Sequence, residues 1–212
     1  MKIFLETPRL VLRQLSEDDV DDLVALDSDP EVMRYINGGV ATSREAIAER
    51  FLPYAMSYYE RDKHLGFWAI VDKQSEEFIG WIFLRPEVDF ELLQQLNLAE
   101  PDAVELGYRI CQRSWGKGYM TEAARALIDK SFTESAIAKI VAWALTEHKA
   151  STRVMEKAGL RLQQEYLVTA DLLSDRRLLA NPLVQNLLDR NIVRYQLNRA
   201  DRIVSISNRF LS

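Results

Sequence analysis

Cysteine, histidine, glycine and proline are all scarce in this chain of 212 residues. It has one cysteine, two histidines, eight glycines and six prolines. A single cysteine cannot form a disulfide within the chain, and with two histidines it cannot complete a Cys/His zinc site. So few glycines and prolines argue against a linker, a collagen-like repeat or a disordered chain. We therefore expect no metal, and the free thiol suits a reducing cytoplasm.

An excess of positive charge and long apolar runs are also missing. The 27 Lys and Arg residues are outnumbered by 32 Asp and Glu, which gives a net charge of −5. This balance argues against binding of nucleic acid through bulk electrostatics. No segment approaches the roughly 18 apolar residues of a membrane span, and Glu6 and Arg9 stand too early for a signal-peptide core. We expect a cytoplasmic protein that binds neither nucleic acid nor membrane.

The apolar pattern predicts one mixed α/β domain covering residues 1–212, without repeats or linkers. Ile47, Phe51, Tyr54 and Tyr58 recur at helical spacing, and Pro53 among them predicts a kink or a break. Strands are expected at residues 10–14, 67–71, 78–84, 103–111, 140–145, 162–169 and 192–197, and helices at 16–28, 29–35, 43–58, 119–133 and 151–158 and after Asn181-Pro182.

Two glycines, Gly116 and Gly118, stand one residue apart between a predicted strand and a predicted helix. The stretch from Arg109 to Lys117 holds three basic residues and no acid. Because glycine lacks a Cβ, the backbone there can turn sharply and direct successive N–H groups at one anion. A pyrophosphate site and a plain strand–helix turn both fit this segment.

The sequence excludes two common phosphate-binding loops. A dinucleotide fingerprint would need glycine or alanine where Thr121 stands, and a Walker loop would need glycine at Cys111.

The segment Arg113-Ser-Trp-Gly-Lys-Gly118 fits the Arg/Gln-x-x-Gly-x-Gly/Ala signature of the GCN5-related N-acetyltransferases. Its setting resembles the branch that acetylates the N-termini of ribosomal proteins. The resemblance implies the fold of that family, a mostly antiparallel twisted sheet flanked by helices, with two central strands splayed apart beside this loop. It covers roughly residues 7–162, and similar segments follow in the same order at residues 7–13, 29–34, 78–80 and 151–159.

The same resemblance implies acetyl-CoA as co-substrate. The backbone at Ile110 and Cys111 would pair with the pantetheine arm, and the amides from Arg113 to Gly118 would hold the pyrophosphate. A family asparagine that contacts pantetheine is His148 here, whose imidazole can still donate a hydrogen bond. The implied cofactor-binding residues are Ile110, Cys111, Arg113, Ser114, Trp115, Gly116, Lys117, Gly118, Thr121 and His148.

Glu105 and Ser151 are the catalytic candidates. Acetyl transfer to an amine needs a base for the amine proton and a stabilised thiolate. Glu105, on the strand that would deliver the thioester, is either the base or a carboxylate that is exposed or paired with Arg109 two residues along. The tyrosine acid common in the family is Met155 here, and Ser151 is either its replacement, as in some relatives, or a plain helix N-cap.

We therefore expect an N-acetyltransferase that passes the acetyl group of acetyl-CoA directly to a primary amine, either a protein N-terminus or a small molecule. The rival interpretation is an acyl-CoA-binding sensor or scaffold without catalysis, and an antibiotic or polyamine acetyltransferase would differ only in its acceptor. Residues 170–191 are atypical for the family. Their leucine-rich helix would either cover the acceptor cleft or form a homodimer contact, and a tail follows at residues 200–212.

Overall fold

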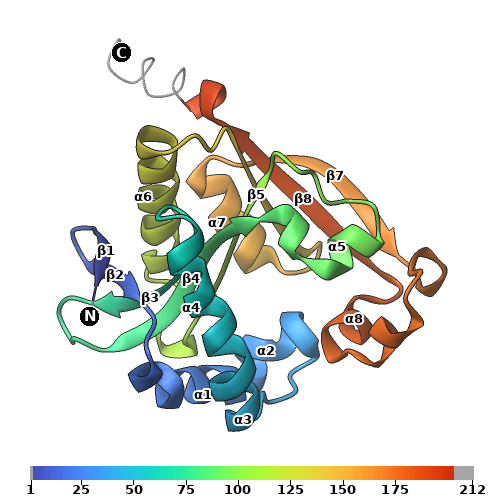
Figure 1. Ribbon diagram of the computed structural model, residues 1–212, viewed down its shortest axis with the longest axis horizontal. Coiled ribbons are helices and arrows are strands. Elements are labelled where there is room, and N and C mark those ends of the chain that lie inside the picture. Colours follow the sequence, from blue (N-terminus) through green and yellow to red (C-terminus); the bar gives the residue numbers. More distant parts are fainter. Residues whose placement is uncertain (1, 203–212) are drawn as a thin grey trace.

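A computed structural model describes residues 2–202, which form one continuous sheet flanked by helices (Figure 1). The strand order is β1-β2-β3-β4-β5-β6-β8-β7. Neighbours in this part of the chain are antiparallel except β5 and β6. The strands are β1 (Ile3–Glu6), β2 (Leu10–Gln14), β3 (Gly66–Asp72), β4 (Phe78–Pro86), β5 (Val104–Ile110), β6 (Lys139–Leu145), β7 (Arg161–Val168) and β8 (Arg190–Asn198).

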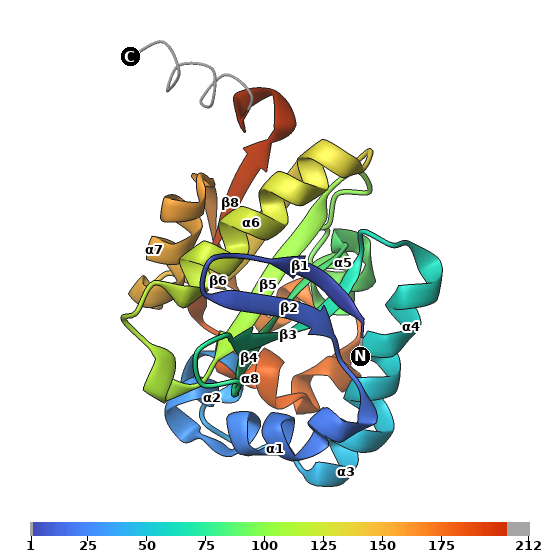
Figure 2. The ribbon, with the colours of Figure 1, turned by 90° about the vertical axis from the view of Figure 1, so that its left-hand side faces the viewer.

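Helices cover both faces of the sheet, as Figure 2 shows with β1 and β2 in front. One face carries α6 and α7, and the opposite face carries α1, α3 and α4. The expected mixed α/β architecture is thus confirmed. The helices are α1 (Val20–Ser28), α2 (Pro30–Asn37), α3 (Arg44–Ala46), α4 (Leu52–Arg61), α5 (Glu91–Gln95), α6 (Tyr119–Glu134), α7 (Lys149–Ala158) and α8 (Pro182–Leu187).

The two parallel strands meet at one end only. β5 pairs with β6 at Val104–Ile140 and Glu105–Val141, and the described ladder ends there. Beyond Glu105 the two strands therefore diverge toward the carboxyl end of β5. Side chains on β5 alternate between the faces, so that Leu106, Tyr108 and Ile110 pack with the core under α6 and α7.

Two local features differ from the sequence prediction. β1 was not expected, and its partner β2 covers it on one side only. At Pro53 the helix neither stops nor breaks: α4 begins at Leu52, directly after a π-helical turn, Ile47–Phe51. Proline removes one backbone donor from a helix, and the π-helical turn lies directly before it, where the Leu52 amide donates to the Ile47 carbonyl.

The leucine-rich helix of the atypical segment is covered by the chain itself. Val184 is 1% exposed and packs in a small core with Leu92 and Leu173. On its other side α8 contacts α2, where the Asn186 side-chain amide donates to the Arg34 carbonyl (3.4 Å). Leu183, Leu187 and Leu188 of this segment are only partly buried, so a homodimer contact stays a prediction. Residues 203–212 of the expected tail lie outside the described residues. None of the described helices is long and apolar enough to cross a membrane.

Candidate active site

The glycine turn links β5 to α6 at the open end of the sheet. A 3-10 turn, Gln112–Ser114, follows β5, and Gly118 is the N-cap of α6. Gly116 (φ 72°) and Gly118 (φ 79°) adopt the left-handed conformation that favours glycine. A Cβ would meet nothing within 4 Å at Gly116 and only the Arg9 guanidinium at 3.6 Å at Gly118. Glycine is therefore favoured at these two positions by the backbone conformation and not by lack of space for a side chain.

Fewer backbone amides between Arg113 and Gly118 are free to bind an anion than the sequence predicted. The amides of Ser114 and Trp115 donate to the carbonyls of Cys111 (2.9 Å) and Gln112 (3.0 Å) inside the 3-10 turn. The first N–H groups of a helix lack acceptors within the helix. The predicted pyrophosphate site therefore loses the amides of Ser114 and Trp115, and its other amides stay a prediction. Thr121 lies in the first turn of α6.

At the end of β5, fewer backbone groups are free for the predicted pantetheine contact than the sequence predicted. The Cys111 amide donates to the Ile79 carbonyl of β4 (2.8 Å), and its carbonyl accepts from Ser114, so both groups are used inside the protein. In an antiparallel ladder the next residue turns its backbone groups the other way, so those of Ile110 face away from β4, toward the gap. The Ile110 carbonyl accepts the Trp115 indole N–H (2.9 Å). The pantetheine contact at Ile110 stays a prediction, and the Trp115 indole occupies the Ile110 carbonyl.

The basic residues between Arg109 and Lys117 partly bind other groups of the protein. Arg109 pairs with the buried Asp27 of α1, whereas Arg113 donates to the Phe78 carbonyl (2.7 Å). Arg9, given no role by the sequence, donates to the carbonyl of Lys117 (2.9 Å). This residue contacts the glycine turn from the connection between β1 and β2. It is 108 positions away along the chain, so no local pattern could indicate it.

Arg9 itself is held by an ion pair with Glu122 of α6 (2.6 Å). The N-terminal segment, the turn and the helix are thus fixed to one another.

Glu105 lies at the closed end of the gap and is 6% exposed. Its carboxylate pairs with Arg85, directly opposite on β4 (2.7 Å), and the interpretations in which it is exposed or pairs with Arg109 are wrong. Burial raises the pKa of Glu105, the Arg85 guanidinium lowers it, and the nearby Glu87 adds to the rise. Glu105 is a buried base candidate with one cationic partner.

Ser151 lies at the other wall of the gap. It is the third residue of α7, so it is not the N-cap, which is His148. Its hydroxyl lies 3.1 Å from the Tyr108 hydroxyl of β5, a residue that the sequence gave no role. Met155 is 2% exposed in the core, one turn further along the helix.

His148 stacks on Tyr35 of α2, with ring centroids 4.3 Å apart. Burial lowers its pKa to about 4, so the imidazole is neutral at pH 7. A neutral ring keeps one N–H for donation.

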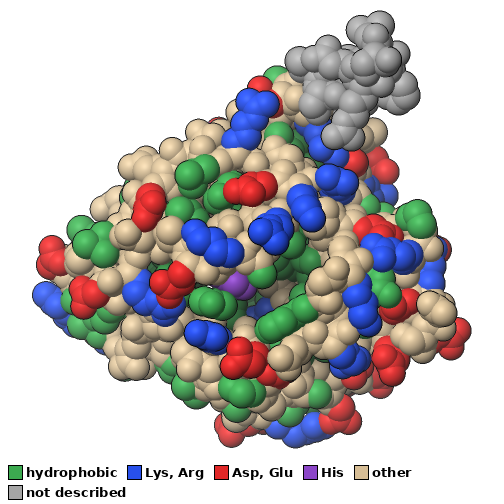
Figure 3. Space-filling view, turned by 180° about the vertical axis from the view of Figure 1, so that it is seen from behind, with side chains coloured by type: hydrophobic (Ala, Val, Ile, Leu, Met, Phe, Trp, Pro, Cys, Tyr) green, Lys and Arg blue, Asp and Glu red, His purple; other side chains and the backbone are tan. Residues whose placement is uncertain are grey.

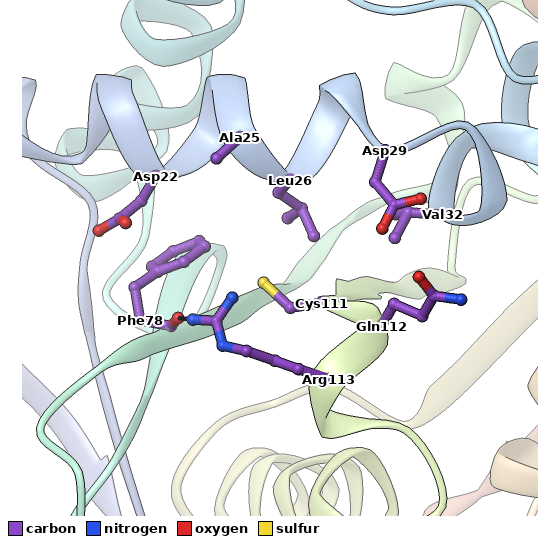
Figure 4. A pocket seen from close by; sticks show the side chains of 9 residues that line it. All are labelled: Asp22, Ala25, Leu26, Asp29, Val32, Phe78, Cys111, Gln112 and Arg113. Carbon is purple, nitrogen blue, oxygen red and sulfur yellow. Dashed lines mark hydrogen bonds between the residues drawn. The ribbon is translucent and has the colours of Figure 1, made fainter.

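A cavity of about 260 Å³ opens between α1, α2 and the residues after β5 (Figure 4). Asp22 and Asp29 contribute carboxylates, and Cys111 and Arg113 reach it from the loop. Burial raises the pKa of Asp22. Seen from behind, the molecule is hollowed near its middle, with Lys and Arg side chains around the hollow (Figure 3).

These features define a class of protein that holds an anionic carrier between separated strands. Residues 9–161 match the family model of the acetyltransferase (GNAT) domain. The chain therefore belongs to the GNAT family of acetyltransferases, and it is an acetyl-CoA-dependent acyltransferase.

Relatives and solved structures agree with this family. The chain is 31% identical over 160 residues to YkkB, an uncharacterised protein of Bacillus subtilis, covering 75% of this chain and 86% of that protein. It is 32% identical over 157 residues to FsC-acetyl coenzyme A-N(2)-transacetylase of Aspergillus fumigatus, covering 74% of this chain and 64% of that protein.

Two solved structures share the fold. Ribosomal L7/L12 α-N-protein acetyltransferase RimL, in complex with coenzyme A, has a TM-score of 0.68 at 16% identity, covering 93% of this chain and 98% of that one. Spermidine N-acetyltransferase from Vibrio cholerae, in complex with CoA and spermine, has a TM-score of 0.65 at 17% identity, covering 93% and 99%.

Proposed function

We propose that this protein transfers the acetyl group of acetyl-CoA to the nitrogen of a primary amine in a ternary complex. The observation that carries the proposal is the gap between β5 and β6, which starts at Glu105 and opens beside the glycine turn. A ligand in this gap has a base candidate at its closed end and a helix N-terminus at its open end.

The residues around the gap suit acetyl-CoA as co-substrate. The N-terminus of α6 and the backbone from Gly116 to Thr121 would hold the pyrophosphate, because free amides and the helix dipole both favour an anion. The backbone of Ile110 would pair with the pantetheine arm once the Trp115 indole has left its carbonyl.

Glu105 would take the proton of the attacking amine, directly or through one water. An amine with a pKa of roughly 8 to 10 is mostly ammonium at neutral pH, so a base is needed. The rise in the pKa of Glu105 brings its carboxylate closer to the range in which a general base works well. Ser151 would donate a hydrogen bond to the developing thiolate.

The acceptor is an amine whose class the fold leaves open, a protein N-terminus or a small molecule. The names of the similar proteins include both kinds of acceptor. Asp22 and Asp29 in the cavity would attract a cationic amine, in keeping with the net charge of −5.

The rival function is an acyl-CoA sensor without turnover, favoured by the absence of the family tyrosine at Met155, which is buried in the core. Assays of thiol release from acetyl-CoA with a panel of peptides, polyamines and amino acids separate the two. The proposal expects release that saturates with one class of amine and falls at least tenfold in Glu105→Gln and in Ser151→Ala. Saturable acetyl-CoA binding without release for any amine would favour the sensor.

A further inference from the structure

Tyr108 and Ser151 tie together the two walls of the gap between β5 and β6. Tyr108 lies three residues beyond Glu105, the last β5 residue paired with β6, and Ser151 lies in the first turn of the helix after β6. The Tyr108 hydroxyl oxygen is 3.0 Å from the Ser151 carbonyl oxygen and 3.1 Å from its hydroxyl oxygen. This places a phenol directly against a serine that would face the leaving thiolate.

One of the two hydrogen-bond arrangements of the pair leaves the Ser151 proton for another acceptor. Tyr108 has one proton and donates it to the Ser151 carbonyl or to the Ser151 hydroxyl oxygen. When Tyr108 donates to the carbonyl, the Ser151 O–H can donate back to the phenol oxygen. When Tyr108 donates to the hydroxyl oxygen, the Ser151 O–H turns toward a third acceptor. Burial raises the pKa of Tyr108, so the phenol keeps its proton and remains a donor at every working pH.

We propose that Tyr108 is a positioning residue for acetyl transfer: it fixes the Ser151 hydroxyl at the gap so that its O–H donates to the sulfur leaving the thioester. The proposal rests on the proposed function. As the amine nitrogen bonds to the acetyl carbon, the carbon–sulfur bond breaks and its electron pair stays on sulfur. The Ser151 O–H stabilises that charge without giving up its proton, and the amine proton passes through Glu105 or water to solvent and finally to the thiolate.

This arrangement accounts for Met155 at the position where the family usually has a tyrosine. The phenol comes instead from β5 and acts through a serine. A serine alone is free to donate back to a carbonyl one helical turn earlier, as hydroxyls in helices often do. Tyr108, as the donor to the Ser151 hydroxyl oxygen, holds that oxygen at the gap.

The experiment compares Tyr108→Phe with Tyr195→Phe. Tyr195 is a matched control because it is also buried and its hydroxyl also bonds to α7, at Glu156 (3.0 Å), but away from the gap. We expect Tyr108→Phe to lower kcat at least tenfold while the KM for acetyl-CoA changes less than threefold, and Tyr195→Phe to keep both. Tyr108→Phe added to Ser151→Ala should cause no further loss.

Three outcomes overturn the inference alone in an active wild-type enzyme: an unchanged kcat in Tyr108→Phe, an equal loss in Tyr195→Phe, or losses that multiply in the double variant. If Tyr108→Phe does not fold, Ser151→Ala compared with Ser151→Thr decides. The Ser151→Thr substitution keeps the hydroxyl, so a threonine variant no better than the alanine variant overturns the inference. Wild-type protein that acetylates no amine overturns the proposed function, and this inference with it.

Discussion

Glu105 and Arg85 face each other across β4 and β5, and their side chains are 8% and 15% exposed. Removing a carboxylate from water raises its pKa, and the guanidinium limits that rise by favouring the charged form. Burial and Arg85 therefore act in opposite directions on the basicity of Glu105, and Glu87 adds to the rise. Their net effect can be tested through the pH dependence of turnover.

A base must be ionised, so activity should fall as pH drops through the pKa of Glu105 in the folded protein. Because that pKa is raised, the fall should begin above the ordinary range of a glutamate, about 4.3. We expect Glu105→Gln to lower kcat about a hundredfold and to remove this acidic limb. Initial rates measured between pH 5 and 9, in steps of roughly one pH unit, give both the change in kcat and the acidic limb. Glu134→Gln, an exposed carboxylate at the end of α6, is the control. A Glu105→Gln profile that keeps the wild-type inflection below the pKa of the amine would contradict the assignment.

Cys111 is the single thiol and lines the cavity, but it is a poor nucleophile there. Burial raises its pKa, so the thiol is protonated at neutral pH. Transfer in a ternary complex needs no acyl-cysteine. Cys111→Ala should therefore keep kcat within about threefold of the wild type, and initial-rate plots against both substrates should intersect. Acetyl groups found on Cys111 by mass spectrometry, with loss of turnover in the variant, would refute direct transfer.

The element that distinguishes this chain is the segment between β7 and β8, whose helix α8 lies against α2. Because α2 also carries Tyr35, which stacks on His148 beside the gap, we expect α8 to support the acceptor side of the site and not the glycine turn. The homodimer contact that the sequence also allowed stays a prediction.

Val184→Ala tests that role. Val184 is 1% exposed, so the lost methyl groups should lower the free energy of unfolding by roughly 1–2 kcal/mol. We expect the KM for the amine to rise severalfold while the dissociation constant of acetyl-CoA stays unchanged. Leu172→Ala, at a half-exposed position in the same segment, should change neither. Equal weakening of both ligands by Val184→Ala would show a general loosening instead.

Local patterns predicted most elements, because a helix or strand shows its buried face in the spacing of a few residues. The strands from β2 onward and the long helix α6 follow that rule. Contacts between distant segments have no such local pattern. Arg85 beside Glu105, Arg9 under the glycine turn and Tyr108 against Ser151 join residues 20, 108 and 43 positions apart.

The site could therefore be located from the sequence, but its partners could not. The Gly116–Gly118 segment pointed to an anion because glycine geometry and charge are local properties. Which amides remain free depends on the 3-10 turn that uses Ser114 and Trp115. A turn of three residues leaves no periodic pattern by which it could be predicted.

The molecule as a whole is acidic, with a net charge of −5, yet its proposed donor is a polyanion. Attraction must then come from one place, where the helix N-terminus and the backbone of the glycine turn concentrate positive potential. All of β1 to β8 belong to one sheet, and that place lies at the end of its strand β5. The single domain expected for residues 1–212 stays a prediction. The central claim is that acetyl-CoA binds there.

Calorimetric titration of acetyl-CoA into Thr121→Glu and Thr133→Glu tests this claim. Both positions lie on α6, the first in its first turn and the second near its other end. A carboxylate in the first turn favours the helix itself but repels a phosphate about 5 Å away by roughly 3 kcal/mol at an effective dielectric of about 20. We predict saturable binding to the wild type and to Thr133→Glu, and binding at least tenfold weaker to Thr121→Glu. No saturable binding to the wild type, or equal binding to the two variants, would contradict the account.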